Sequence, residues 1–266
     1  MEDRGFQFGD GLYEVIHVYD GKFLLLKEHM DRLRRGAEAI CLPYDFERHP
    51  LEPILAEGVR RSGLRDARVY LQITRGVAPR DHVIPEGLTP TVVATFKPRT
   101  LVPDELRRRG ATVMTTPEIR WAWCAIKAIT LLPNVLAKTE AKRRGYDDAV
   151  FVTADGEVRE CTASNVFMVR DGRVFMPPRN ESVLHGITQL FLLECAASAE
   201  IPVVEEPIRL EAFRQADEAF MSSTAVDVLG ITSVDDRPIG DGQVGPITRR
   251  LYEAFVERIP TRLTAL

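Results

Sequence analysis

Residues 121–136 read WAWCAIKAITLLPNVL, and Lys127 is the single charged side chain among these sixteen residues. Lysine is rarely buried completely without a partner. Where burial removes water from a lysine, it disfavours the charged form and lowers the pKa. The neutral amine attacks aldehydes, which is the chemistry of a Schiff-base lysine. The ordinary alternative is a lysine at a strand end, with its stem buried and its ammonium group in water.

A cofactor that forms a Schiff base also needs partners for its phosphate and for its ring nitrogen. His185-Gly186-Ile187-Thr188 opens a predicted helix, whose first N–H groups can bind an anion. Ser222-Ser223-Thr224 is a hydroxyl cluster at a predicted strand end. Arg32 follows an apolar helix face, and Glu160, in a predicted turn between two strands, can pair with a protonated ring nitrogen. The ordinary alternatives are a helix cap at Thr188, turn hydrogen bonds for the hydroxyl cluster, a pair of Arg32 with Glu28, and a surface carboxylate at Glu160.

The hydrophobic pattern predicts a mixture of strands and helices. We expect strands at 12–18, 23–26, 68–75, 91–97, 111–116, 119–127, 148–153, 165–169, 173–176, 202–205, 218–222 and 231–235, and helices at 27–41, 50–62, 132–145, 187–200, 210–216 and 245–258. Residues 76–90 are rich in glycine, proline and charge, which predicts a loop. The least structured stretch predicts a boundary, giving an N-terminal α/β domain at 1–100, a linker at 101–110 and a cofactor-binding domain at 111–266.

Composition excludes several other classes of protein. The net charge is −4, and no basic block is long enough to indicate nucleic-acid binding. The four cysteines are far apart and form no CxxC pair, so we expect reduced thiols in a cytoplasmic protein and no metal site. The start of the chain does not have the pattern of a signal peptide. The apolar run at 121–136 is shorter than the roughly 20 residues that a membrane span needs.

The motifs, taken together, resemble the fold-type IV pyridoxal-phosphate enzymes. The resemblance follows the family's order through nearly the whole chain and rests on residues 3–15 (DRGFQFGDGLYEV), 28–33 (EHMDRL), 74–76 (TRG), 126–127 (IK), 131–138 (LLPNVLAK), Glu160 with 164–167 (SNVF), and 186–188 (GIT). That family includes branched-chain aminotransferases, D-amino-acid aminotransferases, R-selective amine transaminases and aminodeoxychorismate lyase.

The resemblance implies a role for each candidate residue. Lys127 is implied to be the Schiff-base lysine, and Glu160 the partner of the pyridine nitrogen. Leu184 is implied to pack against the ring of pyridoxal 5'-phosphate. The phosphate is implied to be held by Arg32, Ile187, Thr188 and Thr224, with Ser223 nearby, and Gly186 is implied to bind the cofactor. The implied fold is an N-terminal α/β domain and a C-terminal α/β pseudo-barrel domain, in a homodimer with the cofactor between the domains.

Residues 75–82 (RGVAPRDH) resemble the loop that binds the substrate carboxylate in D-amino-acid aminotransferases. There the loop comes from the neighbouring subunit, which implies that Arg80 and His82 act with Tyr13. An arginine fork matches a carboxylate bidentately, and a hydroxyl and an imidazole complete the binding. The alternative is that both are surface charges of a loop. His17 stands where this subfamily often carries lysine, and the opening strands usual in the family are missing from this sequence, so we expect changes in the side-chain pocket and at the domain edge.

The function expected from the resemblance is ping-pong transamination of D-amino acids, with a 2-oxo acid as the acceptor. Three alternatives use the same lysine: a branched-chain L-amino-acid transaminase, an R-amine transaminase, and a lyase that acts on aminodeoxychorismate. A relative that only binds the cofactor is a further alternative, against which the intact Lys127 and Glu160 argue.

Overall fold

The computed structural model describes residues 1–265 and divides into two compact units. Unit 1 contains Met1–Thr100, Ile126–Leu131 and the residues from Pro260 onward. Unit 2 contains Leu101–Ala125 and Leu132–Ile259. Lys127 therefore belongs to unit 1, although the residues on both sides of its short segment belong to unit 2.

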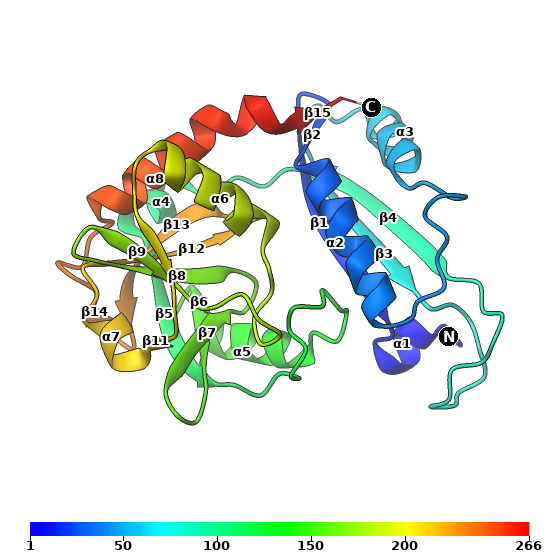
Figure 1. Cartoon of the computed structure of the whole chain (residues 1–266), viewed down its shortest axis with the longest axis horizontal. Coiled ribbons are helices and arrows are strands. Elements are labelled where there is room, and N and C mark those ends of the chain that lie inside the picture. Colours follow the sequence, from blue (N-terminus) through cyan, green and yellow to red (C-terminus); the bar gives the residue numbers. More distant parts are fainter. Residues whose placement is uncertain (266) are drawn as a thin grey trace. The chain divides into compact units, whose positions relative to one another are not determined.

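Unit 1 is an antiparallel sheet with two helices on one face (Figure 1). Its strand order is β15-β2-β1-β3-β4, from β1 Gly11–Tyr19, β2 Lys22–Leu24, β3 Ala67–Thr74, β4 Thr91–Pro98 and β15 Leu263–Thr264. Its helices are α1 Arg4–Phe8, α2 Leu26–Ala39 and α3 Glu52–Ser62. Successive side chains of a strand point to opposite faces. Leu12, Ile16 and Val18 of β1 therefore pack in one core with Met30, Leu33 and Leu55 of the helices.

Unit 2 is built on a second sheet, which closes on itself. Its strands are β5 Ala111–Pro117, β6 Asp148–Val152, β7 Glu157–Cys161, β8 Asn165–Arg170, β9 Arg173–Met176, β10 Val203–Glu205, β11 Ile208–Arg209, β12 Glu218–Ser223, β13 Asp227–Val234 and β14 Arg237–Pro238. The strand order is β10-β9-β8-β12-β13-β5-β6-β7-β11, and an additional β7–β8 pairing joins Glu160 to Asn165. That pairing closes the path from β8 to β7 and gives the sheet its barrel-like form.

Helices lie before, between and after the strands of this sheet in the sequence. They are α4 Asp104–Arg109, α5 Leu132–Arg143, α6 Ile187–Ser198, α7 Leu210–Arg214 and α8 Pro246–Arg258, and the short helix η1 Ile259–Arg262 follows α8. The apolar core of the sheet includes Val150, Val166, Phe213 and Ile231. None of the helices described for residues 1–265 has both the length and the apolar character that a bilayer crossing needs.

Two expectations about secondary structure were wrong near the candidate site. Residues 119–127 form no strand, and Trp121 and Trp123 are exposed rather than packed in a sheet. An apolar pattern without a neighbouring strand to pair with is not enough to form one. Glu160 lies in strand β7 and not in a turn, because the turn at Asp155-Gly156 is followed at once by a strand of mixed charged and apolar residues.

Candidate active site

The segment around Lys127 is fixed against the first strand of unit 1. Strand β2 covers only Val18 and Tyr19 of β1, so the other end of that edge is open to a further segment. There the Tyr13 N–H donates to the Lys127 carbonyl at 3.1 Å, and Leu12 forms an antiparallel bridge with Ala128. Lys127 is half-buried, and its Nζ lies 4.3 Å from the centroid of the Tyr13 ring. The lysine is thus placed by backbone bonds beside the ring of Tyr13, which the resemblance implies is a substrate-binding residue.

Arg32 lies in a buried ion cluster beneath the same strand. It donates from Nε to Glu14 Oε1 and from Nη2 to Glu14 Oε2, both at 2.7 Å. His29 Nδ1 lies 2.7 Å from Glu14 Oε2, and the Glu14 side chain is fully buried. Burial acts to raise the pKa of Glu14, but Arg32 and then His29 outweigh it and hold that pKa at about 2. Burial lowers the pKa of His29, so a neutral imidazole donates its Nδ1–H to the carboxylate.

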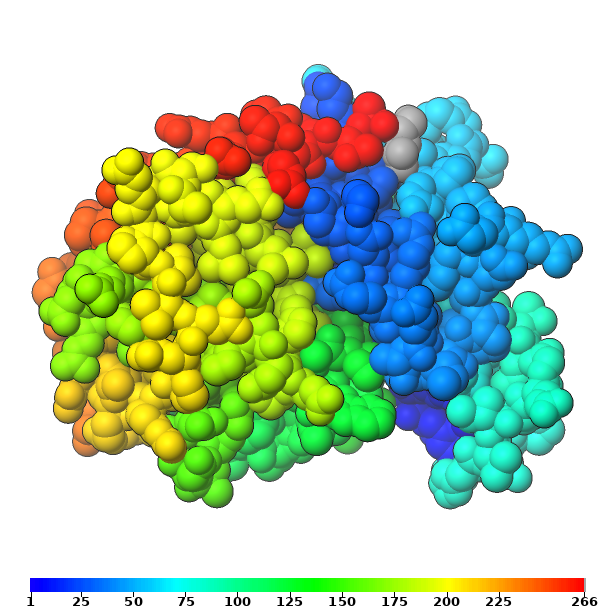
Figure 2. Space-filling view, in the orientation of Figure 1, coloured from blue at the N-terminus to red at the C-terminus, as the bar shows by residue number. Residues whose placement is uncertain are grey.

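The loop with Arg80 and His82 is attached to the N-terminal helix α1 of the same unit. The Arg80 guanidinium carbon lies 4.9 Å from the centroid of the Phe8 ring, and the His82 ring centroid lies 5.5 Å from it. Arg4 Nη1 donates to the Asp81 carbonyl at 2.7 Å. Arg80 and His82 are both exposed, and Figure 2 shows the loop, in the cyan part of the scale, at the surface beside the dark blue N-terminal helix. The structure therefore brings these two residues together on one aromatic ring.

His17 lies on the same face of β1 as Tyr13, four residues further along the strand. It is 3% exposed, and its Nδ1 has no hydrogen-bond partner among the described residues. Burial, followed by the charges of Arg99 and Arg68, lowers the pKa of His17 to about 3. A neutral imidazole therefore stands where the resemblance expects a cationic lysine.

In unit 2, Glu160 is a buried carboxylate at the pairing that closes the barrel. It is 5% exposed. The Leu184 N–H lies 3.2 Å from each of its oxygens, and Asn165 Nδ2 lies 3.3 Å from Oε2. Asn165 Nδ2 also donates to the Leu184 carbonyl at 2.7 Å. The backbone of Leu184, more than its side chain, thus positions Glu160.

Sequence reasoning missed the arginine that pairs with Glu160. Arg120 Nη1 donates to Glu160 Oε1, and Nη2 of the same guanidinium donates to Glu118 Oε2 at 2.6 Å. The Arg120 side chain is 6% exposed and its guanidinium stacks over the Phe151 ring at 4.4 Å. The available signal was the alternation Glu118-Ile119-Arg120 directly before the apolar run, because opposite charges two residues apart can meet where the backbone is extended.

Most of the residues expected to hold the phosphate gather at two places in unit 2, whereas Arg32 lies in unit 1. Gly186 is the N-cap of α6 and makes no side-chain cap, so the first N–H groups of the helix, at Ile187 and Thr188, have no partner within it. Ser223 and Thr224 lie at the end of β12 and in the turn that follows. Ser223 Oγ lies 3.1 Å from Ser164 Oγ, and the fully buried Ser222 Oγ has no partner among the described residues. Open amides and an unpaired hydroxyl group fit a phosphate, and Glu160 fits a protonated ring nitrogen.

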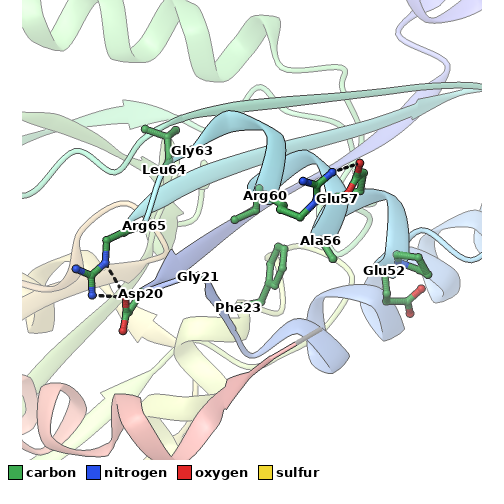
Figure 3. A pocket seen from close by; sticks show the side chains of 12 residues that line it. Asp20, Gly21, Phe23, Glu52, Ala56, Glu57, Arg60, Gly63, Leu64 and Arg65 are labelled. Carbon is green, nitrogen blue, oxygen red and sulfur yellow. Dashed lines mark hydrogen bonds and ion pairs between the residues drawn. The ribbon is translucent and has the colours of Figure 1, made fainter.

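A separate cavity of about 720 Å³ in unit 1 contains none of the expected site residues (Figure 3). It lies between α3 and the β1–β2 turn, and Phe23 and Val59 contribute its apolar wall. Its charged residues are already paired, Arg65 with Asp20, Arg60 with Glu57, and Glu52 with Arg34 from outside the lining. Nothing in its lining indicates chemistry, so the candidate site remains with the clusters described above.

Comparison with known proteins identifies the family. The model of the amino-transferase class IV family matches residues 11–234. D-alanine aminotransferases of Listeria monocytogenes and Staphylococcus epidermidis are 39% and 38% identical, over 97% of this chain and 90% and 91% of those proteins.

Solved structures agree with this match. A branched-chain aminotransferase of Escherichia coli has a TM-score of 0.89 at 28% identity, covering 97% of this chain and 88% of that one. A branched-chain aminotransferase of the Thermoproteus uzoniensis archaeon, solved with norvaline, has a TM-score of 0.86 at 29% identity, covering 98% and 92%. A third branched-chain aminotransferase, solved with pyridoxamine 5'-phosphate, has a TM-score of 0.87 at 27% identity, covering 98% and 88%. The expected fold, with its α/β unit and barrel-like second sheet, is confirmed. The chain belongs to the class IV aminotransferases, the fold-type IV family that its sequence motifs resemble.

Proposed function

We propose that this protein is a pyridoxal-phosphate-dependent transaminase that moves the amino group of a D-amino acid to a 2-oxo acid by a ping-pong mechanism. The observation that carries the proposal is the similarity to D-alanine aminotransferases, at 36–39% identity over at least 97% of the chain. The amino acid is released as a 2-oxo acid, and a second 2-oxo acid leaves as the new amino acid. The reduced state of the four cysteines supports a cytoplasmic location.

The residues present fit the cofactor, whose electron-poor ring supplies a sink for the electron pair left at the substrate α-carbon. Lys127 would carry the cofactor covalently. Glu160 would hold the proton on the ring nitrogen, and Leu184 would lie against the ring. The phosphate would be bound by Arg32, by the amides of Ile187 and Thr188 that follow Gly186, and by the hydroxyl group of Thr224, with Ser223 nearby.

Lys127 also moves the proton in this proposal. Its freed Nζ would take the proton from the α-carbon of the amino acid and, as an acid, would then donate it to carbon C4′ of the cofactor. The Tyr13 ring, 4.3 Å from Nζ, limits where that amine can go. The buried cluster of Glu14, His29 and Arg32 holds strand β1, on which Tyr13 lies, in place.

Substrate binding is proposed for Tyr13, Arg80 and His82, with His17 shaping the side-chain pocket. We further propose a homodimer in which the loop of one subunit serves its partner. The exposure of Arg80 and His82, which lie together against Phe8, supports this arrangement. So does the apolar surface around this loop, where Phe6, Val83 and Ile84 are 76%, 72% and 49% exposed, because exposed apolar clusters mark interaction surfaces.

The central experiment replaces the lysine. Lys127→Ala should abolish the visible absorbance of the bound cofactor and reduce turnover by about a thousandfold or more. Lys22→Ala, an exposed lysine of the same unit, is the control and should behave as the parent does. Normal activity in Lys127→Ala would overturn the assignment.

The rival functions are separated by a substrate screen. The branched-chain aminotransferases among the solved structures favour an L-specific enzyme as the second candidate. Release of 2-oxo acid from D- and L-alanine and from D- and L-leucine distinguishes the two, and we expect the D-enantiomers to react. Activity with the L-enantiomers alone would contradict the proposal. An aminodeoxychorismate lyase would need no 2-oxo acid acceptor, and an R-amine transaminase would accept simple amines as readily as amino acids.

Arg80 can be tested with the same screen. Arg80→Ala should raise the KM for amino acids by about tenfold or more, since a charge-assisted bidentate contact is lost. The KM for a simple R-amine, which lacks a carboxylate, should change little. Arg35→Ala, an exposed arginine on helix α2, is the matched control. An equal effect of Arg80→Ala on both substrate classes would remove Arg80 from carboxylate binding.

A further inference from the structure

Glu160 is held by a charged network that reaches outside its own strand. Its carboxylate bonds to the Arg120 guanidinium, which bonds in turn to both oxygens of Glu118, from Nε at 3.0 and 3.2 Å and from Nη2 at 2.6 Å. The Arg120 backbone N–H donates to Glu118 Oε1 at 2.9 Å, and the Glu118 N–H donates to the Val152 carbonyl at 2.8 Å. The network therefore anchors Glu160 through Arg120 to strand β6.

The charges of this network add to a single negative charge. Glu118 and Glu160 contribute two carboxylates, and Arg120 contributes one guanidinium with a side chain 6% exposed. Burial acts to lower the pKa of Arg120, but Glu118 and Glu160 outweigh it and raise this pKa, so the guanidinium stays charged. One net negative charge balances one protonated ring nitrogen, and a buried charge is costly unless it is balanced in this way.

The other ionisable groups packed around Glu160 are already neutral or paired. Burial raises the pKa of Cys124 to about 11 and also raises the pKa of Cys161 well above its ordinary value, so both thiols are neutral. The remaining charged groups pair among themselves, Lys138 with Asp148 at 2.8 Å and Arg159 with Glu157 at 3.0 Å, while His185 lies 3.1 Å from the Asn180 carbonyl. Among the contacts described, Arg120 is the cation that bonds to Glu160, and Glu118 holds that cation in place.

We propose that Arg120, held by Glu118, is a positioning residue that keeps Glu160 ionised and fixed in one orientation for the ring nitrogen of the cofactor. This inference rests on the proposed function. Without Arg120, two carboxylates would share a buried site, and such like charges raise the pKa of one of them. A protonated Glu160 cannot hold the proton on the ring nitrogen. Without Glu118, Arg120 would pair with Glu160 alone, the network would be neutral, and the hold on a cationic ring would weaken.

The experiment compares three variants of the purified holoenzyme: Arg120→Gln, Arg120→Lys and Glu118→Gln. For each, the cofactor dissociation constant is measured by dialysis, and the visible absorbance of the bound cofactor is followed against pH. Arg120→Gln should weaken cofactor binding by about tenfold and move the acid spectral transition upward by about one pH unit. Arg120→Lys should restore part of both effects, because it keeps the charge and loses the bidentate geometry.

Glu118→Gln gives the opposite sign and keeps the proposal testable if Arg120→Gln does not fold. We expect its acid transition to move to lower pH while cofactor binding weakens severalfold, because the net charge of the network falls to zero. Arg159→Gln, which changes an arginine beside Glu160 on strand β7, is the control and should match the parent in both measurements. A parental pH profile and cofactor affinity in Arg120→Gln, or shifts of the same sign in both variants, would overturn the proposal. Failure of the parent protein itself to bind pyridoxal phosphate would instead refute the proposed function.

Discussion

The two units each contain a buried glutamate paired with an arginine. The two pairs differ in the hydrogen bonds that the carboxylate of the glutamate accepts. Glu14 is fully buried, and contacts of 2.7 Å from Arg32 and His29 occupy both of its oxygens. Glu160 shares its arginine with Glu118, and its bonds to Leu184 and Asn165 are longer, at 3.2 and 3.3 Å. A carboxylate with strong partners on every side is suited to hold structure, whereas one with an arginine on one side and weaker donors on the other can still accept a ligand.

The largest effect should come from breaking the pair of Glu160 with Arg120. Glu160→Gln removes the negative charge that holds a proton on the ring nitrogen, and we expect kcat to fall by about two orders of magnitude. Steady-state kinetics on the holoenzyme measure this change. Glu157→Gln, on the same strand, is the control and should keep parental kinetics, and an equal loss in both variants would point to general damage to β7.

Breaking the first pair should instead cost stability. Glu14→Gln leaves the buried guanidinium of Arg32 without its counter-charge, which should lower the free energy of unfolding by about 3–5 kcal/mol. Denaturant unfolding measures this loss, and Glu38→Gln, an exposed glutamate on helix α2, is the matched control. A change below about 1 kcal/mol would show that the Glu14 cluster does not stabilise the fold.

A more gradual effect should appear as a pH dependence at His17, which is buried without such a pair. Its pKa in the folded protein is about 3, below the ordinary value of 6.5. As pH falls from 6.5 towards 3, the unfolded chain takes up a proton that the folded chain does not, so stability is lost at up to about 1.4 kcal/mol per pH unit. His17→Gln should flatten this part of the stability curve, whereas His49→Gln, at an exposed site, should leave it unchanged. An unaltered slope in His17→Gln would contradict the burial argument.

The smallest effect should come from an ion pair on the surface. Lys27 pairs with Asp31 at 2.6 Å on helix α2, but the lysine side chain is 81% exposed. Lys27→Ala should change the free energy of unfolding by less than about 0.5 kcal/mol, because solvent screens such pairs. A loss of stability as large as that of Glu14→Gln would show that burial does not decide how much an ion pair stabilises this protein.

The same contrast shows what could be predicted from sequence. Lys127 was singled out because a lone charge in an apolar run is visible locally. Glu14 was not singled out, although in a strand over residues 12–18 it falls on the same face as Leu12 and Ile16. Arg120 was missed because it lies 40 residues from Glu160, and only the pairing of β5 with β6 and of β6 with β7 brings them together. The strand expected at 119–127 failed for a related reason, since strand formation depends on a neighbour that the local pattern does not reveal.

The β7–β8 pairing has a consequence for the lifetime of the bound state. The one residue pair that closes the barrel is Glu160 with Asn165, and the same glutamate is proposed to hold the cofactor. Opening of this seam and release of the ring nitrogen are then one event, so a bound ligand slows local unfolding at this place. Amide hydrogen exchange at β7 and β8 should therefore slow when pyridoxal phosphate is added, while the sheet of unit 1 away from Lys127 exchanges at an unchanged rate. Bound cofactor would thus slow the local opening of unit 2 at the β7–β8 pairing.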